Sequence, residues 1–238
     1  MKNNIITPKY KNGVFFRQNK SFVCRKGRTT KSQLKSIEKY WPLFGIDYQL
    51  KPLNFRCVFK HNYPVVLDIG FGSGNSLVKM ATHFCHFNFL GIEVYESGIG
   101  SCLRFAYISN LENLKIIHHN AVEVIETMIL NHTLSKIQIF FPDPWPKKRH
   151  HKRRMIQHDF LENISKKLNY GGILHILTDS KEYAVYILDT IKNINQYLNL
   201  SKKNTFIEYP VDYIKTNFSK KADFLGNKIF NLMFQSKY

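Results

Sequence analysis

The stretch that decides the fold is VVLDIGFGSGNSLVKMATHF, residues 65–84. It begins with a short apolar run interrupted only by Asp68, which is typical of a strand buried in a parallel sheet. Glycines follow at every second position, at Gly70, Gly72 and Gly74, and apolar residues at helical spacing come after them. The stretch therefore predicts a strand, a tight glycine turn and a helix, which is the opening unit of an α/β sheet.

The same alternation continues along the chain. Four more apolar runs predict strands, at residues 87–94, 114–120, 137–142 and 171–179. Helical spacing follows each of them, at residues 97–108, 121–130, 155–168 and 181–194. The tail adds two strands, 205–210 and 227–234, with no helix expected between them. We therefore expect an α/β fold: a mostly parallel seven-stranded sheet with helices on both faces and a C-terminal antiparallel hairpin.

The N-terminal quarter has a different texture. Residues 1–30 are basic and weakly periodic, so we expect an arm that is at least partly disordered in isolation. One helix is predicted near Leu34 to Tyr40, ended by Pro42. We divide the chain into a basic N-terminal arm, residues 1–60, and one domain, residues 61–238.

The composition fits one large domain with a short extension. The chain has 238 residues, 44% of them hydrophobic, so it buries a sizeable core without a disulfide or a metal. No apolar run reaches the ~18 residues of a membrane span, and the N-terminus lacks the apolar stretch of a signal peptide. We expect a cytoplasmic protein that does not enter a membrane.

The cysteines and histidines predict no metal site. Four cysteines are widely spaced without a C-x-x-C pair, which indicates a reducing compartment: Cys24, Cys57, Cys85 and Cys102. His83 and His86 flank Cys85, but a tight site needs four ligands at defined geometry. We interpret them as surface residues at a helix end.

The charge is the strongest compositional signal. The chain carries 35 Lys and Arg against 17 Asp and Glu, a formal net charge of +18. Residues 1–60 hold 14 basic and two acidic residues, whereas residues 61–140 hold four basic and six acidic ones. The densest run, KKRHHKRR at residues 147–154, has six fixed positive charges and no acid. Such a run favours a counter-charge such as phosphate, so a polyanionic partner is predicted.

Acids stand at the strand ends on either side of the glycine turn. The spacing is G-x-G-x-G rather than the G-x-G-x-x-G of dinucleotide enzymes, and Asp68 would repel a pyrophosphate. Its carboxylate suits a cationic ligand instead, such as the sulfonium and ammonium groups of S-adenosylmethionine. Glu93 closes the second strand, where an acid accepts hydrogen bonds from both ribose hydroxyls. Asn120, after the third strand, can accept from an amine and can also be the N-cap of the next helix.

The fourth predicted strand runs into a stiff loop, FFPDPWPKK, residues 140–148. Three prolines in five residues fix the chain in extended turns, and Asp143 lies between two of them. Trp145 follows and either stacks on a base or packs in the core. Because the carboxyl ends of adjacent parallel strands converge on one cleft, we expect Asp143 to face the ligand held by Asp68 and Glu93.

Together these motifs resemble the tRNA (guanine-N7-)-methyltransferase family. The resemblance extends from SFVCRKGRTT (21–30) to NLMF (231–234) and includes FLGIEV (89–94) and LTDS (177–180). PDPW followed by the basic run is its most specific part. The resemblance implies a Rossmann-like class I methyltransferase fold, S-adenosylmethionine as the methyl donor, and tRNA as the acceptor. The methyl group would go to N7 of a guanosine in the variable loop, at position 46.

The resemblance also implies roles for the matching residues. The methyl donor would be bound by Asp68, Gly70, Gly72, Gly74, Glu93, Asn120 and Asp143, and Asp143 would also be catalytic. The acceptor would be contacted by Lys147, Asp179, Thr216, Asn217, Phe218 and Ser219. RNA phosphates would be contacted by Lys148, Arg149, Lys152, Arg153 and Arg154.

A carboxylate close to the guanine has a clear task in such a reaction. Methylation of N7 moves positive charge onto the ring, which makes a fixed carboxylate more favourable as the charge arrives. The carboxylate can also orient the base by accepting hydrogen bonds from it. Either Asp143 or Asp179 can fill this role.

Two positions depart from the family pattern. Most members carry a carboxylate where this chain has Asn120, and many carry an acid where it has Ser219. Two other functions share the fold: an RNA-binding protein that has lost catalysis, and a nicotinamide-dependent oxidoreductase, against which Asp68 and the glycine spacing argue. We expect a monomer or homodimer without an obligatory protein partner.

Overall fold

A mixed sheet forms the centre of the part of the chain that the computed structural model describes, residues 9–11, 14–16, 21–22, 29–203, 205–208 and 214–237. Within these residues the sheet has eight strands, in the order β3-β6-β5-β4-β7-β8-β10-β9. Their bounds are β3 Gly45–Ile46, β4 Val65–Ile69, β5 Asn88–Glu93, β6 Leu114–His118, β7 Leu134–Phe140, β8 Leu168–Thr178, β9 Tyr197–Asn199 and β10 Phe230–Ser236. Neighbours from β3 to β8 are parallel, whereas β10 runs antiparallel to both β8 and β9. The expected fold class is confirmed.

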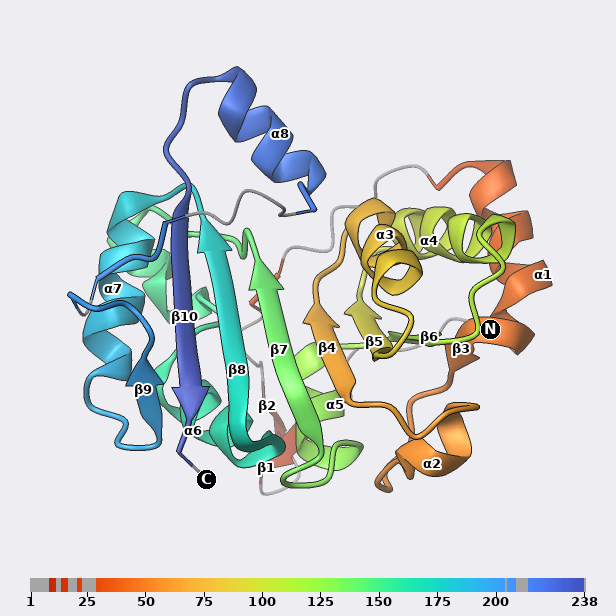
Figure 1. Cartoon of the computed structure of the whole chain (residues 1–238), viewed down its shortest axis with the longest axis horizontal. Helices are drawn as coiled ribbons and strands as arrows, with labels where there is room; N and C mark the ends of the chain where they lie inside the picture. The colour runs from red at the N-terminus through yellow and green to blue at the C-terminus, as the bar shows by residue number, and fades with distance from the viewer. Residues whose placement is uncertain are drawn as a thin grey trace.

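Helices cover both faces of the sheet (Figure 1). One layer consists of α1 Lys31–Phe44, α3 Asn75–His83 and α4 Glu96–Ile108. The other consists of α5 Ala121–Thr127, α6 His158–Lys167 and α7 Lys181–Ile191. The short α2 (Phe55–Val58) lies near the lower end of β4, and α8 (Asn217–Phe224) lies beyond the upper, carboxyl ends of β4, β7 and β8 (Figure 1).

The strand β4 shows why the apolar runs form a buried sheet. Leu67 and Ile69 point into the core on the side of α5, α6 and α7, and Val66 points into the core on the side of α1, α3 and α4. All five residues of β4 are buried, including Asp68. A strand buried on both faces has no polar side to alternate with, which explains the continuous apolar run.

The N-terminal helix extends further than its sequence predicts. Helix α1 continues through Pro42 to Phe44, so the expectation that Pro42 ends it is wrong. A proline removes one backbone donor, but α1 packs along α4 and buries Phe44 in the core, which outweighs that loss. The helix then leads directly into β3, the two-residue edge strand that raises the strand count from seven to eight. The division of the chain at residue 60 stays a prediction.

Most of residues 1–30, the segment expected to be partly disordered, lie outside the described residues. Two short strands, β1 Lys9–Lys11 and β2 Val14–Phe16, pair with each other in antiparallel fashion. Among the described residues, no helix combines the length and apolar character of a membrane span.

The C-terminal tail differs from the expected two strands without a helix. Helix α8 lies between them, and of the described part of 205–210 only Ile207 pairs with the sheet, in a single bridge to Asn231. The edge position beside β10 belongs instead to β9, which the sequence analysis placed in no element. Thr216 begins α8 by accepting a hydrogen bond from the Ser219 N–H, and this short polar cap was missed.

Candidate active site

The chain order of the sheet reverses between β4 and β7. From β4 the chain moves outward to β5 and β6, then returns to the other side of β4 as β7 and β8. In open α/β sheets, ligands bind beyond the carboxyl ends of the strands at such a switch point. Two adjoining cavities of about 430 and 220 Å³ lie there, and they share the lining residues Gly70, Gly72, Tyr95, Phe140, Phe141 and Phe218.

The glycine turn leaves its backbone bare toward these cavities. Gly70, Gly72 and Gly74 have φ values of 75°, 61° and 77°, a region that side chains disfavour. A Cβ on Gly70 or Gly72 would meet no atom within 4 Å, so the space in front of both is open to a ligand. A Cβ on Gly74 would overlap the side chain of Cys102, so Gly74 serves the packing of α3 against α4.

Glu93 links the end of β5 to the glycine turn. Its Oε2 accepts a hydrogen bond from the Gly72 N–H at 2.8 Å, and its Oε1 accepts from the N–H groups of Val94 and Tyr95 at 2.6 and 3.1 Å. The carboxyl is buried, and this desolvation raises its pKa despite the three donors. A carboxylate has about four acceptor sites, so Glu93 retains capacity for a ligand hydroxyl.

Asp68 lies in the larger cavity, fully enclosed by protein apart from that opening. It is 2% exposed, and burial together with the charge of Glu93 raises its pKa to about 7, while Lys136 opposes the shift. A buried carboxylate in such a place favours the arrival of a positive charge. The buried carboxylate of Asp68 thus fits the cationic end of S-adenosylmethionine. The uncovered backbone of the glycine turn lets a ligand approach closely.

Asn120 lines the smaller cavity, and both ends of its amide make hydrogen bonds. Its Oδ1 accepts from the Val122 N–H at 3.2 Å as the N-cap of α5, and its Nδ2 donates to Glu123 Oε1 at 3.1 Å. Glu123 is buried and its other oxygen lies 3.0 Å from His119 Nε2. His119 itself lines the cavity, and Tyr48 stacks on it with ring centroids 3.7 Å apart.

Three residues of this group were not among the site residues predicted from the sequence: His119, Glu123 and Tyr48. The spacing of His119 and Glu123, one before and three after the cap at Asn120, was a usable signal for a polar group at this helix start. Tyr48 carried no such signal, because it comes from the loop after β3 and only the fold brings it to β6.

The loop after β7 carries Asp143 at its exposed centre. Asp143 lines the smaller cavity together with Glu93, and the two charges are close enough that Asp143 contributes to raising the Glu93 pKa. Phe141 and Trp145 stand on either side of the Pro-Asp-Pro segment in left-handed conformations, with φ values of 53° and 46°. Asp179 is also exposed, just beyond the neighbouring strand β8, whose Leu177 pairs with Phe140 of β7. Both acids thus lie on the same side of the switch point, after the ends of adjacent strands.

The four substrate residues predicted at the start of α8 form two pairs, one facing the cavities and one buried in the helix cap. Asn217 and Phe218 face the cavities: Asn217 Nδ2 donates to Ser73 Oγ at 3.0 Å, and Phe218 stacks on Phe141 with centroids 5.8 Å apart. Thr216 and Ser219 are buried and bond each other in the cap of the helix. Thr216 still lines the larger cavity, whereas Ser219 is fully enclosed and lines neither.

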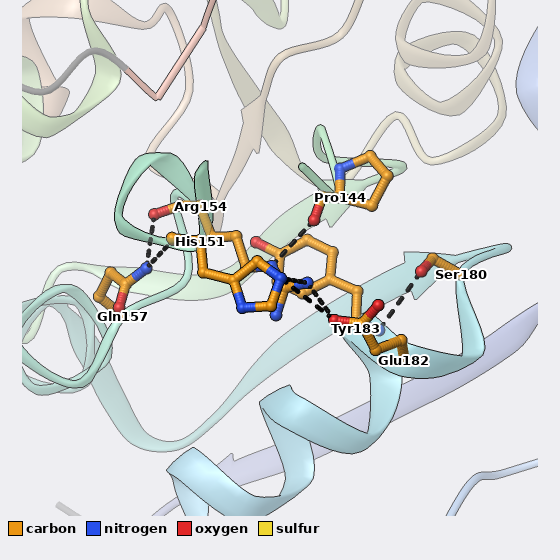
Figure 2. A network of polar contacts seen from close by, with 7 residues as sticks. All are labelled: Pro144, His151, Arg154, Gln157, Ser180, Glu182 and Tyr183. Carbon is orange, nitrogen blue, oxygen red and sulfur yellow. Dashed lines mark hydrogen bonds and ion pairs between the residues drawn. The ribbon is translucent and has the colours of Figure 1, made fainter. Parts of the chain in front are cut away.

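The basic run folds into a 3-10 helix, η1 Lys148–Arg153, beside the Asp143 loop. Lys147, Lys148, Arg149 and Lys152 are exposed, and the Arg153 guanidinium lies over the Trp145 ring, 5.1 Å from its centroid. Arg154 is different, because its side chain is only 2% exposed and its guanidinium contacts Pro144, His151 and Glu182 (Figure 2). The structure gives no support to the predicted contact of Arg154 with an RNA phosphate, because its guanidinium is buried against these protein partners.

The fold and this site define the class of the protein. A bare glycine turn lies at the switch point, where ligands of open α/β sheets bind, with the buried Asp68 beside it and Glu93 at the next strand end. The protein is a class I methyltransferase, and S-adenosylmethionine is its cofactor. Asp68, Gly70, Gly72 and Glu93 are the residues whose geometry fits it.

Comparison with known proteins identifies the family. A family model described as "Putative methyltransferase" matches residues 62–232. The tRNA (guanine-N(7)-)-methyltransferase of Buchnera aphidicola subsp. Schizaphis graminum (strain Sg) is 66% identical over 238 residues, 100% of each chain, and that of Yersinia pestis is 44% identical over the same span. The chain belongs to the tRNA (guanine-N7-)-methyltransferase family.

The solved structures show the same fold at lower similarity. The 16S rRNA methyltransferase KamB superposes with a TM-score of 0.56 at 11% identity, covering 79% of this chain and 94% of that one. A 30S ribosomal A1408 methyltransferase from an uncultured bacterium gives 0.51 at 20% identity, covering 82% and 98%. These likenesses concern the fold alone.

Proposed function

We propose that the protein transfers the methyl group of S-adenosylmethionine to N7 of a guanosine in tRNA, at position 46 of the variable loop. The observation that carries the proposal is the meeting of three parts at one edge of the sheet. The bare glycine turn and the Asp143 loop line the same pair of cavities, and the exposed part of the basic run follows that loop directly along the chain. The full-length relatives named for this activity support the choice of acceptor.

The chemistry asks little acid–base work of the protein. N7 of guanine is a lone-pair acceptor without a proton, so no strong general base is needed. The bound cofactor supplies a methyl group on a positively charged sulfur. The protein must hold the base in line and favour the charge that develops on the ring. Asp143, which lines the smaller cavity, is the group that we propose for this role; Asp179, which follows the neighbouring strand and lines neither cavity, is the alternative.

The residues around the acids would hold and place the RNA. Lys147, Lys148, Arg149 and Lys152 are exposed and would contact phosphates, which position the RNA without reading sequence. Phe218, exposed and stacked on Phe141, offers an aromatic face at the cavity rim. The acceptor would be recognised by shape. With tRNA as substrate, we infer a cytoplasmic enzyme, as a monomer or homodimer.

The decisive test is a methylation assay with a defined acceptor. The protein is incubated with labelled S-adenosylmethionine and an unmodified tRNA transcript, and nucleosides are analysed by mass spectrometry. We expect 7-methylguanosine in that transcript and none in a matched transcript with adenosine at position 46. Intact tRNA binding without methyl transfer would favour the RNA-binding alternative, and 7-methylguanosine at another position would correct the proposed site.

A further inference from the structure

The Asp143 loop adopts a conformation that its own residues disfavour. Phe141 and Trp145 are bulky residues with φ values of 53° and 46°, and each of them strains the backbone. They stand on either side of Asp143, so the strain lies at the proposed reaction centre. A conformation of this kind persists only where surrounding contacts determine it.

The side chain of Arg154 forms a hydrogen bond with the backbone of this loop. Its Nε donates to the Pro144 carbonyl oxygen at 2.8 Å, at the residue directly after Asp143 (Figure 2). On its other side, Nη2 donates to Glu182 Oε1 at 2.6 Å, and Glu182 belongs to α7. One planar guanidinium therefore links the Asp143 loop to helix α7. A lysine ammonium does not reproduce this geometry.

The surroundings of Arg154 fix its orientation. Its guanidinium lies 5.0 Å from the Tyr183 ring centroid and 4.9 Å from that of Tyr186, both on α7. His151 Nε2 lies 3.0 Å from Arg154 Nη2 and 3.3 Å from Glu182 Oε1. The hydrogen bond from Arg154 lowers the pKa of Glu182, which keeps the carboxylate charged as its partner.

A second set of contacts holds the backbone around Arg154 to the same helix. Gln157 Nε2 donates to the carbonyl oxygens of His151 and Arg154 at 2.9 and 3.1 Å, and Gln157 Oε1 accepts from the Tyr186 hydroxyl at 2.7 Å. The Ile156 N–H donates to the Tyr183 hydroxyl at 3.3 Å. The end of the basic run is thus fastened to α7 independently of the loop, which makes it a rigid base for Arg154.

We propose that Arg154 and Glu182 are positioning residues that hold the Asp143 loop in its strained, reactive conformation. This role rests on the proposed function, because Asp143 is the group being positioned. Arg154 touches neither cavity, so its effect on the reaction passes through Pro144. The exposed residues of the same run bind RNA, and the buried one sets the geometry of the loop between the two substrates.

The test uses Trp145 as a reporter within the loop. The chain has two tryptophans, so Trp41→Phe leaves Trp145 as the sole one. In that background we compare Arg154→Lys and Glu182→Gln with the parent by acrylamide quenching, S-adenosylhomocysteine binding and tRNA methylation. We expect stronger quenching of Trp145 in both variants. Because a misplacement of about 1 Å can cost 100-fold in rate, we expect kcat to fall about 30- to 100-fold for Arg154→Lys and about 3- to 10-fold for Glu182→Gln.

Two controls separate positioning from a general loss of structure. S-adenosylhomocysteine binding should stay within about threefold, because the glycine turn and Glu93 are untouched, and Asp189→Asn, an exposed acid on the same helix, should change nothing. If Arg154→Lys fails to fold, Glu182→Gln decides the question. Parent-like quenching and kcat in Glu182→Gln would overturn the proposal. A parent without methyl transfer would overturn the proposed function instead, while the quenching comparison would still report on the loop.

Discussion

The glycine turn after β4 and the proline loop after β7 stand side by side and are held in opposite ways. Both leave adjacent parallel strands, and both reach left-handed backbone conformations. After β4 the chain uses glycines, which adopt these conformations freely and leave the backbone bare. After β7 it uses Phe141 and Trp145, which disfavour them, and the buried Arg154 donates a hydrogen bond to the Pro144 carbonyl between the two.

The charged residues differ in the same way between these two regions. We call the glycine turn with the neighbouring strand ends the glycine side, and the loop after β7 with the basic run the loop side. The acids of the glycine side, Asp68 and Glu93, are buried at 2% and 4% exposure, where their fields are strong. The charged residues of the loop side, from Asp143 to Lys152, are mostly exposed to solvent. The difference indicates that the glycine side encloses a small molecule. The loop side is suited to a large polyanion, with Asp143 at a fixed position beside it.

The largest expected effect is the loss of the acid on the loop side. Asp143→Ala should lower kcat by about 100- to 1,000-fold, because it removes a fixed charge from the site where charge develops. Filter-binding of tRNA should remain close to that of the parent, since the exposed basic residues stay. Asp159→Ala, at another exposed acid, on α6, is the control and should have normal turnover. Normal turnover in Asp143→Ala would remove Asp143 from the reaction.

A single methyl group added to the glycine turn should weaken ligand binding. Gly72→Ala places a Cβ into the open cavity and forces alanine to a φ of 61°, so we expect at least a tenfold rise in the S-adenosylhomocysteine Kd. Gly226→Ala is the matched control, with a φ of 67° and open space, but at the end of α8. Both variants should lose about 1 kcal/mol of stability from backbone strain. Equal Kd values for the two would mean that Gly72 does not face the ligand.

A third effect depends on pH and concerns Asp68. Its pKa of about 7 in the ligand-free protein means that a cationic ligand must bind the ionised minority below pH 7. The Kd of S-adenosylhomocysteine should therefore rise toward tenfold per pH unit as the pH falls from 7 to 5, and level off above pH 8. Asp68→Asn should bind weakly with no such dependence, as titration calorimetry can measure. A flat profile in the parent would place the ammonium group elsewhere.

The same carboxyl predicts a stability change in the ligand-free protein. Its folded-state pKa lies above the ordinary value of 3.8, so the folded state retains a proton that the unfolded state loses. Stability from this group is present at low pH and is lost as the pH rises from about 4 through 7. Asp68→Asn should accordingly raise the melting temperature at pH 8 more than at pH 4.

A feature could be predicted from the sequence when the residues that form it lie close together along the chain. The strand ends, the glycine turn and the stiff loop depend on residues within a few positions, and Asp68, Glu93 and Asp143 do meet at one edge. Arg154 looked like one more cation of a basic run, because its partner Glu182 lies 28 residues further along the chain. No local pattern reveals that burial.

The departures from the family pattern also look different once the fold is known. Ser219, where many members carry an acid, is fully buried and completes the cap of α8 with Thr216. Asn120 keeps an acid at its side, since its amide donates to Glu123. Position 120 alone suggested a missing carboxylate, whereas the structure shows one three residues further on in the same buried group.

The smallest expected effect tests whether the exposed cations of the loop side act only through charge. Lys148→Met and Lys152→Met should each reduce the slope of log K against log salt for tRNA binding by about 0.7–0.9 for each phosphate that the variant no longer neutralises. Affinity should fall only a few-fold, and kcat at saturating tRNA should stay unchanged, because neither side chain reaches the cavities. Lys79→Met, an exposed lysine on α3 of the glycine side, should leave the slope as it is. If the Lys79 variant lowered the slope as much as the others, the RNA would extend over both sides of the molecule, and the division between a small-molecule side and a polyanion side would fail.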